Sequence, residues 1–178
     1  MKLNAKFFTV ILTLYSFFLF SQNTKDSFIV INGTTNVNSF KCVNDDFHQL
    51  IPLSLENSPK NKFSETSINL IVKDFDCKNK MMTSDFRNTL NEEKYPFLNV
   101  TFLTLEKIAD NKFRGFVQVK MMNKLKKYYI DFSLENSKLV GNKKLKFSDF
   151  GIVPPKKLGG LIAVKDSLDL AFSLKIKQ

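Results

Sequence analysis

The sequence is poor in the residues on which most enzymes and metal sites depend. Its 178 residues include one histidine, two cysteines, six glycines and no tryptophan. His48, Cys42 and Cys77 do not make a four-ligand zinc set. A Ser/His/Asp triad would have to use His48, and no Gly-x-Ser-x-Gly turn accompanies it. Gly159-Gly160 has neither the spacing nor the Lys-Ser/Thr of a phosphate-binding loop. We therefore expect no metal and no cofactor.

The acidic residues do not indicate a catalytic pair either. Asp45-Asp46 and Glu92-Glu93 are neighbours in loop-like segments, where solvated acids are common. General acid/base chemistry needs paired carboxylates or a histidine in a pocket. Cys42 lies close to His48 in the sequence, but a disulfide explains the two cysteines better than a nucleophile does. The sequence therefore indicates a protein that is not an enzyme.

The N-terminus has the layout of a cleaved signal peptide. Two lysines give it a positive start, and the uncharged apolar run Phe7–Phe20 follows. This run is shorter than the roughly 20 residues that a membrane-spanning helix needs. Ser21 is a small residue at the expected cleavage point. We predict a signal peptide over residues 1–21 and one domain over residues 22–178, exported to the periplasm or secreted. The alternative is an uncleaved anchor or a buried first helix.

The charge balance is basic. The chain has 27 Lys and Arg against 17 Asp and Glu, a formal net charge of +10. Such a balance can indicate nucleic acid, an anionic membrane surface or acidic ligands. Export argues against nucleic acid. Two interpretations stay open, which are a solvated basic surface and peripheral contact with an anionic envelope surface.

Cys42 and Cys77 both follow the predicted signal peptide. In an oxidising compartment two cysteines can pair. The loop closed by such a bond would stabilise the fold by roughly 3–4 kcal/mol in the chain-entropy model. We predict a Cys42–Cys77 disulfide, and two buried free thiols are the alternative.

Alternation of apolar and polar residues is the strongest structural signal. A half-buried strand keeps alternate residues on one face, whereas a helix does not. The C-terminal segment shows this pattern best, with apolar residues at Leu168, Leu170, Phe172, Leu174 and Ile176. Further strand candidates are Phe28–Ile31, Ile68–Val72, Val100–Leu103, Phe116–Lys120 and Tyr128–Glu135. The pattern predicts an all-β domain of about eight antiparallel strands, in a barrel or a sandwich.

One stretch is expected to be helical. Thr83 or Ser84 can cap its start, and Phe86 and Leu90 fall on one face. The helix should end before Tyr95-Pro96, where proline forbids continuation. The predicted bulges, turns and loops are at Asn32-Gly33, Asp110-Asn111, Gly141-Asn142 and residues 151–160.

Phenylalanine is the dominant aromatic residue. The chain has 19 Phe, 4 Tyr and no Trp. Phe without Trp or many Tyr favours a dry interior over a wet binding face. An eight-stranded barrel can be filled by its own side chains or can hold one small ligand. The composition fits both a filled core and an apolar cavity.

Five segments form an ordered series of motifs along residues 28–176: Phe75–Leu90, Lys94–Phe102, Phe113–Val119, Phe147–Ile152 and Asp166–Lys175. In this order they resemble the YceI-like family of exported lipocalin-like barrel proteins. The chain departs from that family at Asn36–Cys42, where no histidine stands, and at Phe147, which replaces an arginine, so the resemblance is to a divergent branch.

The resemblance implies a lipocalin-like barrel that binds a long apolar lipid such as an isoprenoid, without catalysis. An alternative function is an envelope β-sandwich or barrel protein with a filled core, acting in interactions or structure. The sequence indicates no oligomeric state. From the alternation, the inward-facing candidates for lipid contact are Phe102, Val117, Val119, Ile130, Phe132, Leu170, Phe172 and Leu174.

Overall fold

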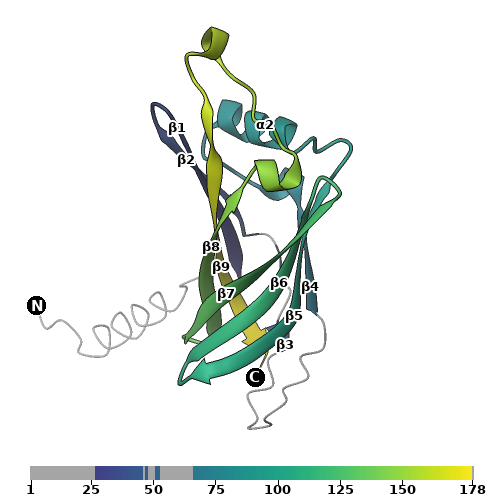
Figure 1. Cartoon of the computed structure of the whole chain (residues 1–178), viewed down its shortest axis with the longest axis vertical. Helices are drawn as coiled ribbons and strands as arrows, with labels where there is room; N and C mark the ends of the chain where they lie inside the picture. The colour runs from purple at the N-terminus through teal and green to yellow at the C-terminus, as the bar shows by residue number, and fades with distance from the viewer. Residues whose placement is uncertain (1–26, 46, 48–50, 53–65, 178) are drawn as a thin grey trace, which may run out of the picture.

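Eight antiparallel strands curl around a common interior, and one short helix lies at one end (Figure 1). The computed structural model describes residues 27–45, 47, 51–52 and 66–177. The predicted signal peptide and His48 lie outside the described residues. The predicted antiparallel, lipocalin-like all-β fold with one short helix is confirmed for the described part of the chain.

The strands follow the sheet order β2-β1-β9-β8-β7-β6-β5-β4, and a short ninth strand, β3, pairs in parallel with β9. Most neighbours in the sheet are therefore neighbours in sequence, and β9 returns to lie between β1 and β8. The strands are β1 Phe28–Thr35, β2 Ser39–Asn44, β3 Ile51–Pro52, β4 Thr66–Ile71, β5 Phe97–Ala109, β6 Lys112–Met121, β7 Lys124–Glu135, β8 Lys138–Lys146 and β9 Val164–Lys177. The helical segments are η2 Val72–Asp74, α2 Lys80–Thr89, η3 Ser148–Phe150 and η4 Leu158–Gly160.

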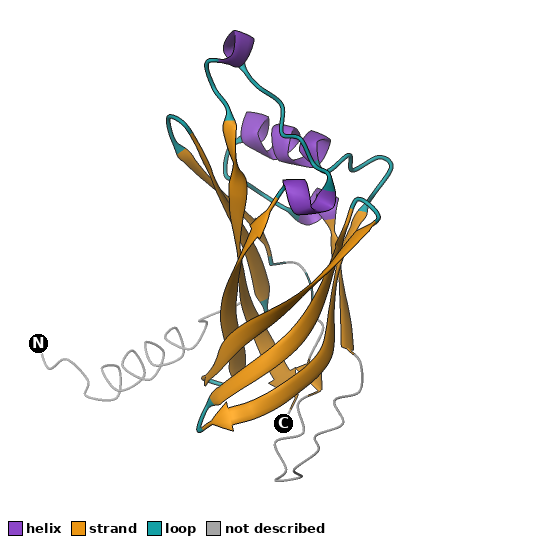
Figure 2. Cartoon of the chain, viewed as in Figure 1, coloured by secondary structure: helices purple, strands orange, loops and turns teal. Residues whose placement is uncertain are grey.

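The two ends of the barrel differ in their connections (Figure 2). The helix α2 and the segment between β8 and β9 gather at one end, together with the turns β1–β2 and β6–β7. We call this the helical end. The opposite end, which we call the hairpin end, carries the tight turns β5–β6 and β7–β8.

Residues in the left-handed region close the hairpins. Asn111 has φ 55°, Met122 and Asn123 have φ 43° and 66°, and Asn136 and Ser137 have φ 48° and 60°. Consecutive left-handed residues match the right-handed twist of the flanking strands. The predicted turn at Asn111 is confirmed. The turn predicted at Gly141 is wrong, because Gly141 lies inside β8 and the chain reverses earlier, at Asn136-Ser137.

Position 141, inside β8, carries a glycine because an aromatic ring packs against the backbone there. A Cβ at Gly141 would lie 2.5 Å from the ring of Phe132 and 3.0 Å from the carbonyl oxygen of Asp131. A Cβ at Gly115, on β6, would lie 3.0 Å from the same ring. Glycine inside a strand often marks such a close approach. Phe132, on the strand between them, therefore packs over two glycines. At the predicted Asn32-Gly33 bulge, the register between β1 and β9 shifts just after Gly33.

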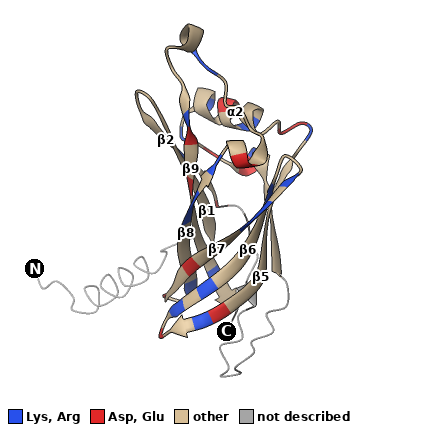
Figure 3. Cartoon of the chain, in the orientation of Figure 1, with Lys and Arg blue, Asp and Glu red and all other residues tan. Residues whose placement is uncertain are grey.

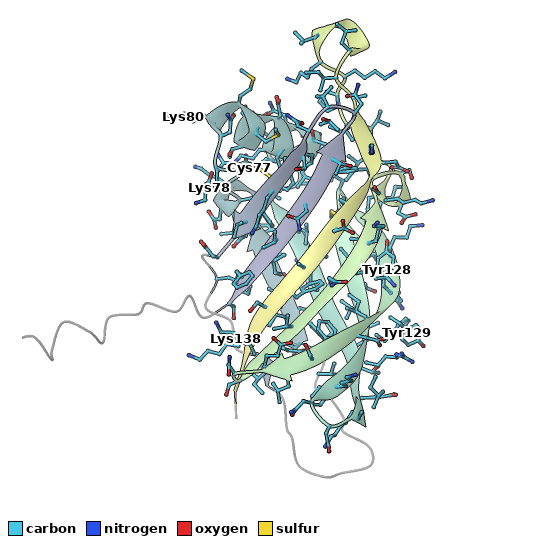
Figure 4. All side chains as sticks on the ribbon, turned by 90° about the vertical axis from the view of Figure 1, so that its left-hand side faces the viewer. Cys77, Lys78, Lys80, Tyr128, Tyr129 and Lys138 are labelled. Carbon is cyan, nitrogen blue, oxygen red and sulfur yellow. A yellow bond between two sulfur atoms is a disulfide. The ribbon has the colours of Figure 1, made fainter. Side chains whose placement is uncertain are left out.

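The disulfide closes the seam between the two edge strands. Val43 on β2 and Asp76, after β4, exchange two backbone hydrogen bonds of 2.9 Å. Beside this bridge, the structure joins Cys42 to Cys77, 35 residues later, as the cysteine count predicts. Both cysteines are buried, and Cys77 lies next to the start of α2 (Figure 4). The bond therefore fastens the barrel at its helical end.

The helix begins earlier than the sequence suggests. The side chain of Asn79 accepts a hydrogen bond from the Met82 amide at 3.0 Å and caps α2, so the predicted cap at Thr83 or Ser84 is wrong. The Thr83 hydroxyl instead accepts the Cys77 amide at 3.0 Å. The predicted buried face is confirmed, because Phe86 and Leu90 are both in the core.

Candidate functional site

All eight residues predicted to face inward are buried in one hydrophobic core. They come from β5, β6, β7 and β9, so strands distant in the sequence meet there. Their predicted role as lipid contacts stays a prediction. The eight residues are Phe102, Val117, Val119, Ile130, Phe132, Leu170, Phe172 and Leu174, and each has at most 3% of its surface exposed.

Three phenylalanines of this set pack against one another across the interior. The ring centroids of Phe102 and Phe132 lie 5.6 Å apart, and those of Phe132 and Phe172 lie 5.9 Å apart in an edge-on arrangement. These distances are those of favourable aromatic pairs. The three rings come from alternate strands, β5, β7 and β9. At this level the interior is occupied by the protein's own side chains.

A cavity of about 350 Å³ lies at the helical end. Three segments that are far apart in the sequence build its wall, which is mainly apolar. The lining residues are Thr35, Asn38 and Phe40 around the β1–β2 turn; Met81, Met82, Asp85, Phe86 and Thr89 on α2; and Phe147, Pro154, Pro155, Lys157, Leu158, Ile162 and Val164 around the loop before β9.

The floor of this cavity is part of the hydrophobic core. Phe86 and Phe147 both line the cavity and belong to the core, with 6% and 2% of their surfaces exposed. Phe40 and Met82 are partly buried and pack against the same core. An apolar ligand in the cavity would therefore contact core side chains directly.

Polar contacts hold the loop 151–163 over the cavity. The Asn36 side chain donates to the Leu161 carbonyl at 2.8 Å and accepts the Ala163 amide at 3.0 Å. On the other side, Lys157 Nζ donates to the Asp85 carboxylate of α2 at 2.7 Å. The loop is thus fastened both to the β1–β2 turn and to the helix.

A carboxylate fixes the start of the same segment. Asp166 accepts hydrogen bonds from the Ser148 hydroxyl at 2.6 Å and the Ser148 amide at 2.8 Å. These bonds lower the pKa of Asp166 below its ordinary value. They keep Phe147, the residue before Ser148, at the cavity floor.

A tyrosine on β7 holds the next turn, η3. Tyr128 donates its hydroxyl proton to Asp149 at 3.2 Å. Burial first, and then the Asp149 carboxylate, raise the pKa of Tyr128 above its ordinary value. Its neighbour Tyr129 is exposed and stacks on Phe116 at 4.8 Å (Figure 4). Tyr128 therefore ties β7 to η3, which follows the cavity residue Phe147.

Within residues 27–45, 47, 51–52 and 66–177, no three His, Cys, Asp or Glu side chains gather as metal ligands would. In that same part of the chain, no helix has the length and apolar character to cross a membrane.

The alternation of apolar and polar residues in the sequence could not identify the residues that line the cavity. Most of them lie on α2 and in the loop before β9, where no period of two exists. The available signal is an apolar loop broken by Pro154-Pro155, together with Met81-Met82 on a short helix. These features indicate an apolar surface but do not say that the two segments meet.

The strand order, the helix across one end and the buried interior define a lipocalin-like antiparallel barrel. Among solved structures, this fold is that of YceI-type proteins. BcnA from Burkholderia cenocepacia is 14% identical, with a TM-score of 0.63, over 82% of this chain and 94% of that one. A polyisoprenoid-binding domain from Saccharophagus degradans is 9% identical, with a TM-score of 0.55, over 83% and 91%. A YceI protein from Campylobacter jejuni is 18% identical, with a TM-score of 0.50, over 64% and 71%.

The resemblance to the YceI-like family is therefore confirmed at the level of the fold. No protein-family model matches the sequence, and neither does any curated protein. At these identities the similarity concerns backbone architecture, and the chemistry of the site has to be argued from this chain's own side chains.

Proposed function

We propose that this protein is an exported, non-catalytic carrier that binds an apolar lipid chain, of isoprenoid or fatty type, at the helical end of its barrel. The observation that carries this proposal is the cavity of about 350 Å³, whose floor is made of core phenylalanines. Its volume lies within the range of small-molecule sites, roughly 300–1,000 Å³. The polyisoprenoid-binding domain with the same fold supports this class of ligand.

Apolar burial alone can supply the affinity. Each CH₂ group moved from water into the cavity gains about 0.8 kcal/mol, so a long chain needs no charged anchor. A chain longer than the cavity would extend toward the inward-facing set around Phe132, and the side chains there would have to move. Specificity would then depend on the length and shape of the chain rather than on hydrogen bonds.

The alternative function, a filled barrel that acts through its surface, is favoured by one observation. Phe102, Phe132 and Phe172 already occupy the interior. If the cavity at the helical end took no ligand, this packing would make the barrel a scaffold for envelope contacts.

The cavity can be filled without disturbing the barrel. Ile162 lines it from the loop, and Ile162→Trp should occupy much of its volume. We expect protein purified from its native host to release a long-chain lipid in native mass spectrometry, and Ile162→Trp to lose most of that lipid. Ile108→Trp, at the exposed hairpin end of β5, is the matched control and should keep it.

Phe172→Leu tests whether the ligand reaches the barrel interior. The substitution changes the shape of a buried side chain there but keeps the position apolar. A change in the length of the retained chain would support such an extension. The proposal fails if delipidated protein takes up no isoprenoid or fatty chain, or if Ile162→Trp and Ile108→Trp retain lipid equally.

Export and cleavage are part of this proposal. The apolar run Phe7–Phe20 and the buried Cys42–Cys77 disulfide both support passage into an oxidising compartment. The intact mass of protein from the native host should correspond to a chain that begins at or near Gln22. A mass that includes Phe7–Phe20 would contradict cleavage.

A further inference from the structure

The helical end exposes large apolar side chains on three separate projections. Five residues form what we call the apolar rim: Val37 at the β1–β2 turn, Met81 on α2, and Val153, Leu158 and Leu161 on the loop before β9. Their exposed fractions are 63%, 73%, 88%, 71% and 75%. A soluble protein surface rarely gathers such side chains without a partner.

Hydrogen bonds and an ion pair bring the rim residues together. Asn36, which precedes Val37, is bonded to the Leu161 carbonyl at 2.8 Å. Lys157, which precedes Leu158, is paired with Asp85 at 2.7 Å, one helical turn after Met81. The three projections thus form one surface, although residues 36 and 161 are far apart in the sequence.

The rim borders the mouth of the cavity. Met81 and Leu158 both line the cavity and are largely exposed, so they lie where it meets the solvent. In Figure 1 the loop 151–163 reaches beyond the other elements at this end. A surface that covers the rim would therefore also cover the opening.

The charge of the loop fits an anionic surface. Between Gly151 and Lys165 there are three lysines, Lys156, Lys157 and Lys165, and no Asp or Glu. Figure 3 shows basic residues on this projecting segment. Lysine stems can lie along apolar groups while their ammonium heads stay in the headgroup region.

We propose that the helical end docks on an anionic lipid bilayer, with the apolar rim inserted at the headgroup–acyl boundary and Lys156 and Lys165 at the lipid phosphates, while Lys157 stays paired with Asp85. The rim residues are aliphatic or methionine and stand on separate tips, whereas protein-binding hot spots are enriched in Trp, Tyr and Arg. Apolar groups flanked by lysines are the composition of an interfacial membrane contact. Docking itself needs no ligand; only the passage of a lipid from bilayer to cavity rests on the proposed function.

The absence of tryptophan gives a direct test of insertion. Leu161→Trp places a single fluorophore on the rim, and Ile108→Trp places one at the hairpin end. With equimolar phosphatidylcholine and phosphatidylglycerol vesicles, the emission of Leu161→Trp should shift to the blue and be quenched by lipids brominated in the acyl chain. Ile108→Trp should show neither effect. The proposal is overturned if neither fluorophore responds or if both respond equally.

Two sets of variants separate the apolar and the charged contributions. The double variant Leu158→Ser with Leu161→Ser should bind the mixed vesicles at least about tenfold more weakly in sedimentation, since two large side chains no longer leave water. Lys156→Gln should weaken the same binding about fivefold, as one lysine near an anionic surface does. It should leave the weak binding to pure phosphatidylcholine unchanged.

Ile108→Ser and Lys112→Gln, at the hairpin end, are the matched controls and should bind like the wild type. Equal losses in rim and control variants would refute the docking surface. So would a wild type that does not bind the mixed vesicles, or one that binds a protein from the envelope through the rim and no vesicles. Lipid retention, measured separately by native mass spectrometry, tells a failure of docking from a failure of the carrier proposal.

Discussion

The hairpin end and the helical end of this barrel differ in what encloses them. At the hairpin end, left-handed residues close tight turns, and alternating strands lead into a core that Phe102, Phe132 and Phe172 fill. At the helical end, α2 and the loop 151–163 surround a cavity and expose apolar side chains. The regular strands supply stability, and the irregular connections supply the surface on which binding can occur.

The largest expected effect is on the free energy of unfolding, and it comes from the buried phenylalanines of the barrel interior. Phe132→Ala removes the central ring of the buried row, and we expect a loss of about 3–5 kcal/mol. Tyr129→Ala, the next residue on β7, is exposed and should cost far less. Urea denaturation followed by circular dichroism measures both. Equal losses would mean that the interior row does not carry the stability of the barrel.

The next largest loss of stability should come from removing the disulfide, and the structural loosening should be greatest at the helical end. Replacing Cys42 and Cys77 together with alanine should cost roughly 3–4 kcal/mol, because the unfolded chain regains the entropy of the open loop. Hydrogen exchange should become faster at the bridged amides of Val43 and Asp76, while the β5–β6 hairpin stays protected. Uniformly faster exchange would contradict a local role at the seam.

Gly141→Ala tests the packing of the interior from the backbone side. The new methyl group would press against the Phe132 ring and the Asp131 carbonyl oxygen. We expect a loss of about 1–3 kcal/mol from overpacking. In a Phe132→Ala background the same change should cost less, since the ring is gone. Additive losses would show that the ring is not what requires glycine there.

The hydrogen bonds between the Asn36 side chain and the loop 151–163 should contribute little to the free energy of unfolding, and their loss should loosen only the loop. Asn36→Ala removes two side-chain hydrogen bonds to the loop, worth about 0.5–1.5 kcal/mol each at most. Limited proteolysis within residues 153–163 should become faster while the melting temperature changes little. Asn142→Ala, on β8, is the control. Unchanged proteolysis would mean that the Lys157–Asp85 pair alone holds the loop.

The smallest effect concerns pH. Asp166 has a folded-state pKa below its ordinary value of 3.8, because Ser148 donates to the carboxylate. Its stabilisation is therefore fully present above the unfolded pKa and is lost as the pH falls through the folded one. Asp166→Asn should lose less stability than the wild type when the pH is lowered through the acidic range. Asp76 and Asp131, whose pKa values are also lowered, should leave part of the acid sensitivity in both proteins.

The sequence predicted the strands well where their residues alternate, because a period of two reflects one buried face. The sequence-based prediction was wrong at two positions, a turn and a helix cap. Gly141 suggests a turn, yet the ring of Phe132 requires a glycine at that position inside a strand. Thr83 suggests a helix cap, yet its hydroxyl binds the Cys77 amide and Asn79 caps the helix. At Gly141 the deciding partner lies on a neighbouring strand, whereas the helix start is decided by the local contact between Asn79 and the Met82 amide.

By itself, the sequence was enough to predict the all-β class, a set of buried strand residues and the pairing of Cys42 with Cys77, because each prediction depends on a local period or on a count. Only the tertiary structure decided where a cavity lies. The cavity exists because the β1–β2 turn, α2 and the loop before β9 are brought together by Asn36, Lys157 and the Cys42–Cys77 disulfide. Those contacts join residues distant in the sequence, and no local pattern records them.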